Sequence, residues 1–251
     1  MRSLTLLLLT RNHRYATPEL NEILYLHHRG ITRIRNLQPY RGLRCLHIES
    51  NALSRLDGLE ELTELTQLYV DGNILENLAG IERLRKLRHL NANDNSLSTL
   101  EHVRDHPSLQ TIFVRGNRIR TAEAFAALQT CASLTSLDVA QNDIEDVTVL
   151  DEIKSIQSIE LLHFARGNPA AVSIEGYRHV LTSALPSLRW LDDAEIHPEI
   201  DRRVAEAHLT GGPDRELAEI RAIRAERKAS LAAEHKSFPA ACADLITECS
   251  A

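Results

Sequence analysis

The segments LHIESNAL (46–53), LYVDGNIL (68–75), LNANDNSL (90–97) and IFVRGNRI (112–119) share one pattern, L-x-L-x-x-N-x-L, in which Ile can replace Leu. Their asparagines follow one another at intervals of 22 residues. LDVAQNDI (137–144) repeats the pattern, and an earlier copy, LYLHHRGI (24–31), keeps the spacing with Arg29 at the asparagine position. Self-similarity at a fixed period indicates a chain built from stacked copies of one structural unit.

The residue types in the pattern have a physical reason. The two apolar residues of L-x-L lie on one face of a short strand, because successive side chains of a strand point to opposite faces. The asparagine turns the chain out of the strand, and its amide can satisfy backbone groups that no sheet partner reaches. We expect these asparagines to stack as a ladder; they are Asn51, Asn73, Asn95, Asn117, Asn142 and Asn168.

One such unit cannot bury its apolar face alone, so neighbouring units must stack on one another. The sequence therefore predicts an α/β leucine-rich-repeat solenoid of six to seven units, over residues 24–168, with short parallel strands on its concave face. After each asparagine, apolar residues recur at intervals of three, as in Leu75, Leu78, Ile81, Leu84 and Leu87. That spacing suits 3₁₀ or tight helical turns on the convex face.

Both ends of a solenoid need covers. We expect residues 1–23 to form an N-terminal helical cap, with Thr17 as a helix N-cap before Pro18. Residues 169–195 interrupt the repeat and form the expected C-terminal cap. Residues 196–251 form a polar extension, expected as helices over 199–209 and 214–236 that Gly211-Gly212-Pro213 separates. The apolar residues expected to close the C-terminal end are Tyr177, Val180, Leu185, Leu188, Trp190 and Leu191.

Composition excludes several classes of partner and compartment. The 251 residues carry a formal charge of −6, from 35 acidic and 29 basic residues, which does not favour a nucleic-acid-binding surface. No stretch approaches the roughly 20 apolar residues of a membrane span. The opening MRSLTLLLLTRNHRY superficially resembles a secretion signal but lacks a small-residue cleavage site. The four cysteines show no disulfide framework. We expect a cytoplasmic, monomeric protein without nucleic-acid or membrane partners.

The chain shows no signature of catalysis or of cofactor binding. Motifs for nucleotide phosphates, zinc proteases and serine hydrolases are absent from the sequence. His27, His28 and His47 could approach Glu49 on adjacent repeats, but no ligand-spaced motif supports a metal there. We therefore expect no enzyme activity, no cofactor and no metal.

The outward strand positions favour protein binding. The residue between the two strand leucines is aromatic in three of seven repeats, although aromatics make up 4% of the chain. Exposed aromatics flanked by charges are typical of protein contacts, whereas the alternative is that Tyr and Phe simply suit strands. A third outward column is expected at His28, Ser50, Gly72, Asp94, Gly116 and Gln141. The predicted partner-binding residues are Tyr25, His27, His47, Glu49, Tyr69, Asp71, Asn91, Asn93, Phe113, Arg115 and Asp138.

Three flanking segments carry a resemblance to a known family. YATPELNEILYLHHRGI (15–31), YRHVLTSALPSLRWLDD (177–193) and DRRVAEAHLTGG (201–212) resemble the dynein axonemal assembly factor 1 family. The resemblance implies a non-enzymatic scaffold for cytoplasmic preassembly of outer-arm dynein in cells with cilia or flagella. Its implied partners are dynein arm subunits and chaperones. Two alternatives share this repeat type: a regulatory subunit of a protein phosphatase and a spliceosomal adaptor.

Overall fold

The computed structural model describes residues 17–248, and the side chains of residues 17–233. The apolar segment Leu4–Leu9, with the expected N-terminal cap helix and the signal-like opening, therefore lies outside the described residues. The described residues form two compact units: residues 17–177 with 184–196, and residues 178–183 with 197–248. The first contains the repeats and the second contains the C-terminal helix.

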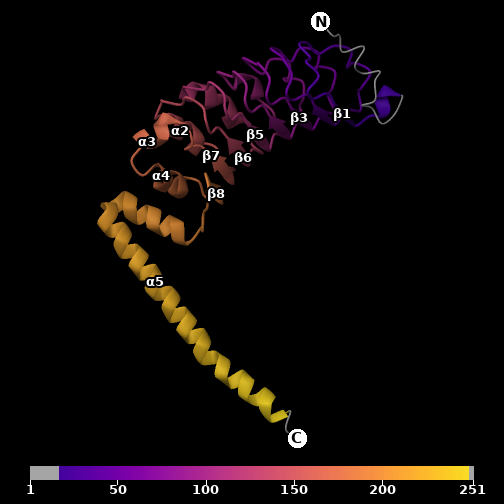
Figure 1. The fold of residues 1–251 in the computed structure, drawn as a ribbon. Coiled ribbons are helices and arrows are strands. Elements are labelled where there is room, and N and C mark those ends of the chain that lie inside the picture. The colour runs from indigo at the N-terminus through magenta and orange to yellow at the C-terminus, as the bar shows by residue number, and fades with distance from the viewer. Residues whose placement is uncertain (1–16, 249–251) are drawn as a thin grey trace. The chain divides into compact units, whose positions relative to one another are not determined.

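The repeats stack into one sheet whose strand order follows the sequence (Figure 1). Seven consecutive pairs are parallel, and the last pair, β8 with β9, is antiparallel. This arrangement is the predicted leucine-rich-repeat solenoid. The strands are β1 (Ile23–Tyr25), β2 (Cys45–His47), β3 (Gln67–Tyr69), β4 (His89–Asn91), β5 (Thr111–Phe113), β6 (Ser136–Asp138), β7 (Leu161–His163), β8 (Trp190–Leu191) and β9 (Ala194–Glu195).

The strand register places one leucine or isoleucine of each repeat directly beside the next. Leu46 pairs with Leu24 on one side and with Leu68 on the other, and all three side chains are fully buried. The last repeat, LHFARGN (162–168), has one residue more than L-x-L-x-x-N before its asparagine. It keeps the same strand register, because His163 pairs with Asp138. The extra residue is taken up between the buried Phe164 and Asn168, where Gly167 adopts a positive φ of 76°.

Each ladder asparagine joins its own turn to the neighbouring repeat. The Asn95 amide donates to the carbonyl oxygens of Val70, Ala92 and Asn93, at 3.1, 3.2 and 2.9 Å. Its Oδ1 accepts the N–H of Leu75 at 3.0 Å. One side chain thus satisfies four backbone groups. The carbonyl of the preceding repeat is bonded in the same way by Asn51, Asn73, Asn117, Asn142 and Asn168.

The convex face carries the apolar residues spaced by three. Leu75, Leu78, Ile81, Leu84 and Leu87 are all fully buried. The backbone here is mostly turns, with 3₁₀ helices η2 (Glu101–Val103) and η3 (Ala122–Thr130) and the α-helix α2 (Val149–Lys154) in later repeats.

The N-terminal edge differs from expectation at one residue. The 3₁₀ helix η1 (Pro18–Leu20) begins at Pro18, as expected, but the Thr17 side chain makes no capping hydrogen bond. The carbonyl of Thr17 instead accepts a bond from the Asn21 amide at 3.0 Å. Thr17 is therefore the N-cap residue by position, as predicted, but its side chain does not cap, because a single 3₁₀ turn leaves few backbone donors to satisfy.

The C-terminal edge contains α3 (Pro169–Ser173) and α4 (Tyr177–Ala184), followed by β8. Leu185, Leu188 and Leu191 are buried as expected. Trp190 is not buried, since 40% of its surface is exposed. The prediction for Trp190 is wrong because strand alternation gives the inward position to Leu191 and turns the indole outward.

The second unit contains α5 (Ile200–Glu248), which departs from helical geometry at Gly212, where φ is 69°. The break falls within the Gly-Gly-Pro segment, and the helix then continues past residue 236 to Glu248. Arg203, before the break, forms ion pairs with Glu219 at 2.7 Å and Glu226 at 2.8 Å. The two segments of α5 therefore pack against each other as a hairpin. None of the described helices is both long and apolar enough to cross a membrane.

Replacing Asn95 by alanine tests the ladder. The change leaves the Leu75 N–H and three carbonyls without their side-chain partner, and we expect a loss of about 2–4 kcal/mol. At about 2–4 °C per kcal/mol, the thermal midpoint falls by roughly 5–15 °C. Asn95→Asp keeps the acceptor but faces the carbonyls with a second oxygen, so it should destabilise at least as much. Calorimetry of both variants checks this, and an unchanged midpoint for both would contradict the ladder.

Candidate functional site

The predicted first column lies along the outward face of the sheet, which we call the strand face. Strand pairing aligns Tyr25 with His47, His47 with Tyr69, and Tyr69 with Asn91. The same pairing continues through Phe113, Asp138 and His163. Tyr25 is 45% exposed, whereas the later members are half-buried because they pack side by side. The repeat thus converts a spacing of 22 residues into a row of touching side chains.

Aromatic rings stack along the first strands of this row. The rings of Tyr25 and His47 stack at a centroid distance of 4.8 Å, and those of His47 and Tyr69 stack at 4.4 Å within 2° of parallel. His89 continues the row, since its ring lies 5.1 Å from Tyr69 and 5.4 Å from Phe113. Burial lowers the pKa of His89, which favours its neutral form. The result is a continuous strip of rings from β1 to β5.

His89 is a member of the strip that sequence reasoning missed. It occupies the first position of β4, in register with Gln67 and Thr111, so it belongs to a different column from the tyrosines. Both residues that flank an inward leucine point outward. A search for aromatic and histidine residues in that preceding column would have found it.

Carboxylates border the aromatic strip. Glu49 Oε1 lies 3.3 Å from His47 Nδ1 and 3.7 Å from His27 Nδ1. The other oxygen, Glu49 Oε2, is buried and has no hydrogen-bond partner. Asp71 accepts a bond from the Asn91 amide at 2.9 Å, and burial, helped by the nearby charges of Glu49 and Asp94, raises the pKa of Asp71. This end of the strand face therefore presents negative charge beside aromatic rings.

The remaining predicted residues form a hydrogen-bonded chain toward later repeats. Asn91 Oδ1 accepts the Asn93 N–H at 3.2 Å, and Asn93 Oδ1 accepts the Arg115 N–H at 2.7 Å. Arg115 Nε donates to Gln141 at 2.6 Å, and Asp138 accepts the Ala140 N–H at 3.0 Å. A hollow of about 100 Å³ follows, lined by Arg115, Asp138, Ala140, His163, Arg166, Asp192 and Asp193. The far end of the strand face is thus of mixed charge.

The predicted third column is not part of the strands. Its members sit at the left-handed turn that follows each strand, with φ between 52° and 67°. Residues other than glycine rarely adopt this backbone conformation, which explains why glycine occupies two of these positions, Gly72 and Gly116. At Gly116 an added Cβ would meet Asp94 Oδ1 at 2.4 Å, so the Asp94 side chain would have to move. His28 is one of these turn residues, and His27 also lies beyond the end of β1.

The cysteines of the repeats serve packing. Cys45 and Cys131 are free and buried. Burial raises the pKa of both thiols, so neither is activated as a nucleophile.

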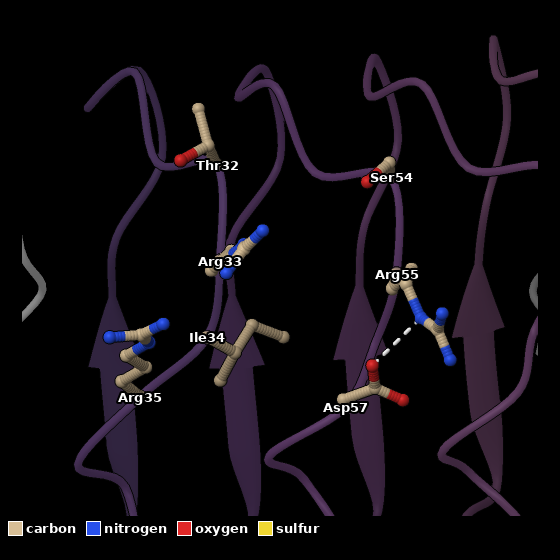
Figure 2. A pocket seen from close by; sticks show the side chains of 7 residues that line it. All are labelled: Thr32, Arg33, Ile34, Arg35, Ser54, Arg55 and Asp57. Atoms are coloured by element: carbon tan, nitrogen blue, oxygen red, sulfur yellow. Dashed lines mark ion pairs between the residues drawn. The ribbon is translucent and has the colours of Figure 1, made fainter. Parts of the chain in front are cut away.

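A separate hollow opens on the loops that follow β1 and β2 (Figure 2). It measures about 390 Å³ and is lined by Thr32, Arg33, Ile34, Arg35, Ser54, Arg55 and Asp57. Arg55 pairs with Asp57 at 2.8 Å. Ile34 is the only buried residue of this lining, and every polar side chain in it is exposed. The hollow contains none of the predicted site residues.

Fold and strand face together define a class: the chain is a leucine-rich-repeat protein. Among solved structures, an internalin of Listeria monocytogenes matches with a TM-score of 0.59 over 77% of this chain and 53% of the internalin. The two sequences are 18% identical, so the likeness concerns the fold alone. No family model matches the chain.

Curated relatives confirm the resemblance seen in the sequence. The dynein axonemal assembly factor 1 homolog of Drosophila erecta is 48% identical over 217 residues, which are 85% of this chain and 14% of that protein. Leucine-rich repeat-containing protein ODA7 of Chlamydomonas reinhardtii is 41% identical over 218 residues, 87% of this chain and 50% of that protein. This chain is a homologue of dynein axonemal assembly factor 1 and spans half or less of the length of these two relatives.

The raised pKa of Asp71 predicts that the stability of the fold depends on pH. Because its pKa is raised on folding, the folded state binds more protons than the unfolded state just above the ordinary value of about 3.9. The free energy of unfolding therefore falls as pH rises through the folded pKa of Asp71. At neutral pH the ionised Asp71 still lowers the stability of the folded state. Asp71→Asn removes this titration and keeps an acceptor for Asn91.

We therefore expect the Asp71→Asn variant to melt above the unsubstituted chain at pH 7, with the difference shrinking as pH is lowered toward about 4. Thermal melts of both proteins across this range measure it. If Asp71→Asn instead melts below the unsubstituted chain at pH 7 and at higher pH, the Asp71 carboxylate is stabilising and the prediction is contradicted.

Proposed function

We propose that this chain is a non-enzymatic scaffold that assists cytoplasmic preassembly of axonemal outer-arm dynein. The homology to dynein axonemal assembly factor 1 supports the process, and the strip of stacked rings on the strand face supports protein binding as its means. Its partners are dynein arm subunits, brought together with chaperones. The relevance to cilia or flagella follows from the axonemal dynein in the relatives' names.

The side chains of the strand face are pre-ordered for binding one protein partner. Its side chains are already ordered by stacking and by the chain from Asp71 through Asn91 and Asn93, so binding loses little conformational entropy. Tyrosine and arginine are the residue types that most often dominate protein interfaces. Tyr25, Tyr69 and Arg115 supply both types on one surface.

The carboxylates beside the aromatic rings of the strand face favour a partner segment with a positively charged side chain. Glu49 and Asp71 carry negative charge beside Tyr69, and Glu49 Oε2 lacks a hydrogen bond. An arginine of the partner could donate a charge-assisted hydrogen bond to the Asp71 carboxylate beside the aromatic strip. We therefore propose that the dynein subunit presents an arginine-containing segment to β1–β3.

Removing the rings tests this proposal. In a Tyr69→Ala/Phe113→Ala variant, the inward Leu68 and Ile112 remain, so the fold should be retained. Loss of interface anchors costs about 2 kcal/mol or more, which corresponds to roughly thirtyfold weaker binding. The measurement is quantitative capture of dynein arm chains, identified by mass spectrometry, from extracts of ciliated cells.

Val147→Ala is the matched control, because Val147 is an apolar residue that is 48% exposed and lies outside the strands. We expect it to capture dynein chains as the unsubstituted protein does. Equal capture by the ring variant and the control would contradict the role of the strand face. Co-purification of a phosphatase catalytic subunit instead of dynein chains would contradict the proposed function itself.

A further inference from the structure

The C-terminal helical unit brings two imidazoles and a carboxylate together. His208 Nδ1 lies 2.8 Å from Glu216 Oε2, and His179 Nε2 lies 3.6 Å from Glu216 Oε1. The two imidazole rings stack at 4.2 Å. Candidate ligand atoms of the three residues all lie within 4.8 Å of one another, and no other group of three His, Cys, Asp or Glu among the described residues meets this condition.

The hairpin of α5 creates this cluster. His208 and Glu216 lie on opposite sides of the break at Gly212, and the ion pairs of Arg203 with Glu219 and Glu226 hold the two segments together. His179 joins them from α4. The cluster spans 38 residues of sequence, from 179 to 216, so no short motif predicts it.

We propose that His179, His208 and Glu216 bind one Zn²⁺ ion. Two imidazole nitrogens and one carboxylate oxygen are ligands that zinc accepts, and zinc sites with three protein ligands leave a fourth position for water or for a donor from a partner. Zinc bonds of about 2.0–2.1 Å place tetrahedral ligand atoms about 3.4 Å apart. The separation of His179 and Glu216 already matches this value.

The surroundings favour metal binding over a purely solvated cluster. The three side chains are 25%, 19% and 24% exposed. The other ring nitrogen, His179 Nδ1, is buried without a hydrogen-bond partner, so reorienting the ring breaks no hydrogen bond at that atom.

Metal binding requires a small rearrangement. The 2.8 Å hydrogen bond between His208 and Glu216 must lengthen by about half an ångström, and the stacked rings must rotate so that both lone pairs meet one ion. In return, the ion would cross-link α4 to both segments of α5. Zinc would therefore stabilise the hairpin, independently of whether the strand face binds dynein.

Titration of the purified full chain with metal tests the site. Cys242 and Cys249, whose side chains lie outside the described residues, are first replaced by serine so that no thiolate from this segment contributes. After chelator treatment, the chain is titrated with Co²⁺, whose visible bands report four-coordinate geometry, and then with Zn²⁺ in competition. We expect one ion per chain, with micromolar or tighter affinity for zinc and a raised melting temperature of the helical unit.

Glu216→Gln and His208→Gln should each weaken zinc binding at least tenfold. His47→Gln is the matched control, because His47 also lies beside a glutamate, and it should bind zinc as the parent does. Glu216→Gln is nearly isosteric, so it is decisive even where His208→Gln loses helical structure. Absence of stoichiometric binding, or zinc affinity unchanged in Glu216→Gln, would overturn the proposal.

Discussion

The hydrogen bonds of the asparagine ladder are the interaction on which the repeat structure depends. Each side chain bonds its own turn and the carbonyl of the preceding repeat, as Asn73 does with Val70 at 2.9 Å and with Ile48 at 3.2 Å. Buried backbone groups must find partners, and strands of three residues offer few. The asparagines supply the missing partners at every turn. They thereby fix the distance between repeats and the direction in which each strand leaves the sheet.

The strand face follows from that constraint. Once leucines fill the core and asparagines hold the turns, the outward residues are not needed to fill the core, and their identity is freer to serve binding. His47, fixed between Tyr25 and Tyr69, illustrates the result, because the spacing of the repeats sets the spacing of the rings. Asp71 carries a burial penalty at the same face, a cost typical of functional surfaces.

The repeats could be predicted from sequence because their signal is periodic and local. The leucine spacing predicted the solenoid, and the outward column predicted that the residues from Tyr25 to Asp138 align. Predictions failed at single residues and beyond the ends of the strands: Trp190 faces outward, and the column through Ser50 and Asp94 lies in left-handed turns. Thr17 is the N-cap residue, as predicted, but its side chain makes no capping hydrogen bond. His106 escaped notice too, since it replaces a leucine and is satisfied by backbone carbonyls in the core. The cluster of His179, His208 and Glu216 depends on a hairpin, and no local pattern encodes it.

The central claim is that the strand face itself contacts a dynein arm subunit. A photo-crosslinking amino acid placed at position 91, between Tyr69 and Phe113, measures this contact directly in ciliated cells. The account predicts covalent capture of a dynein arm chain from position 91 and none from position 147, outside the strands. Equal capture from both positions, or capture of dynein chains from position 147 alone, would contradict it.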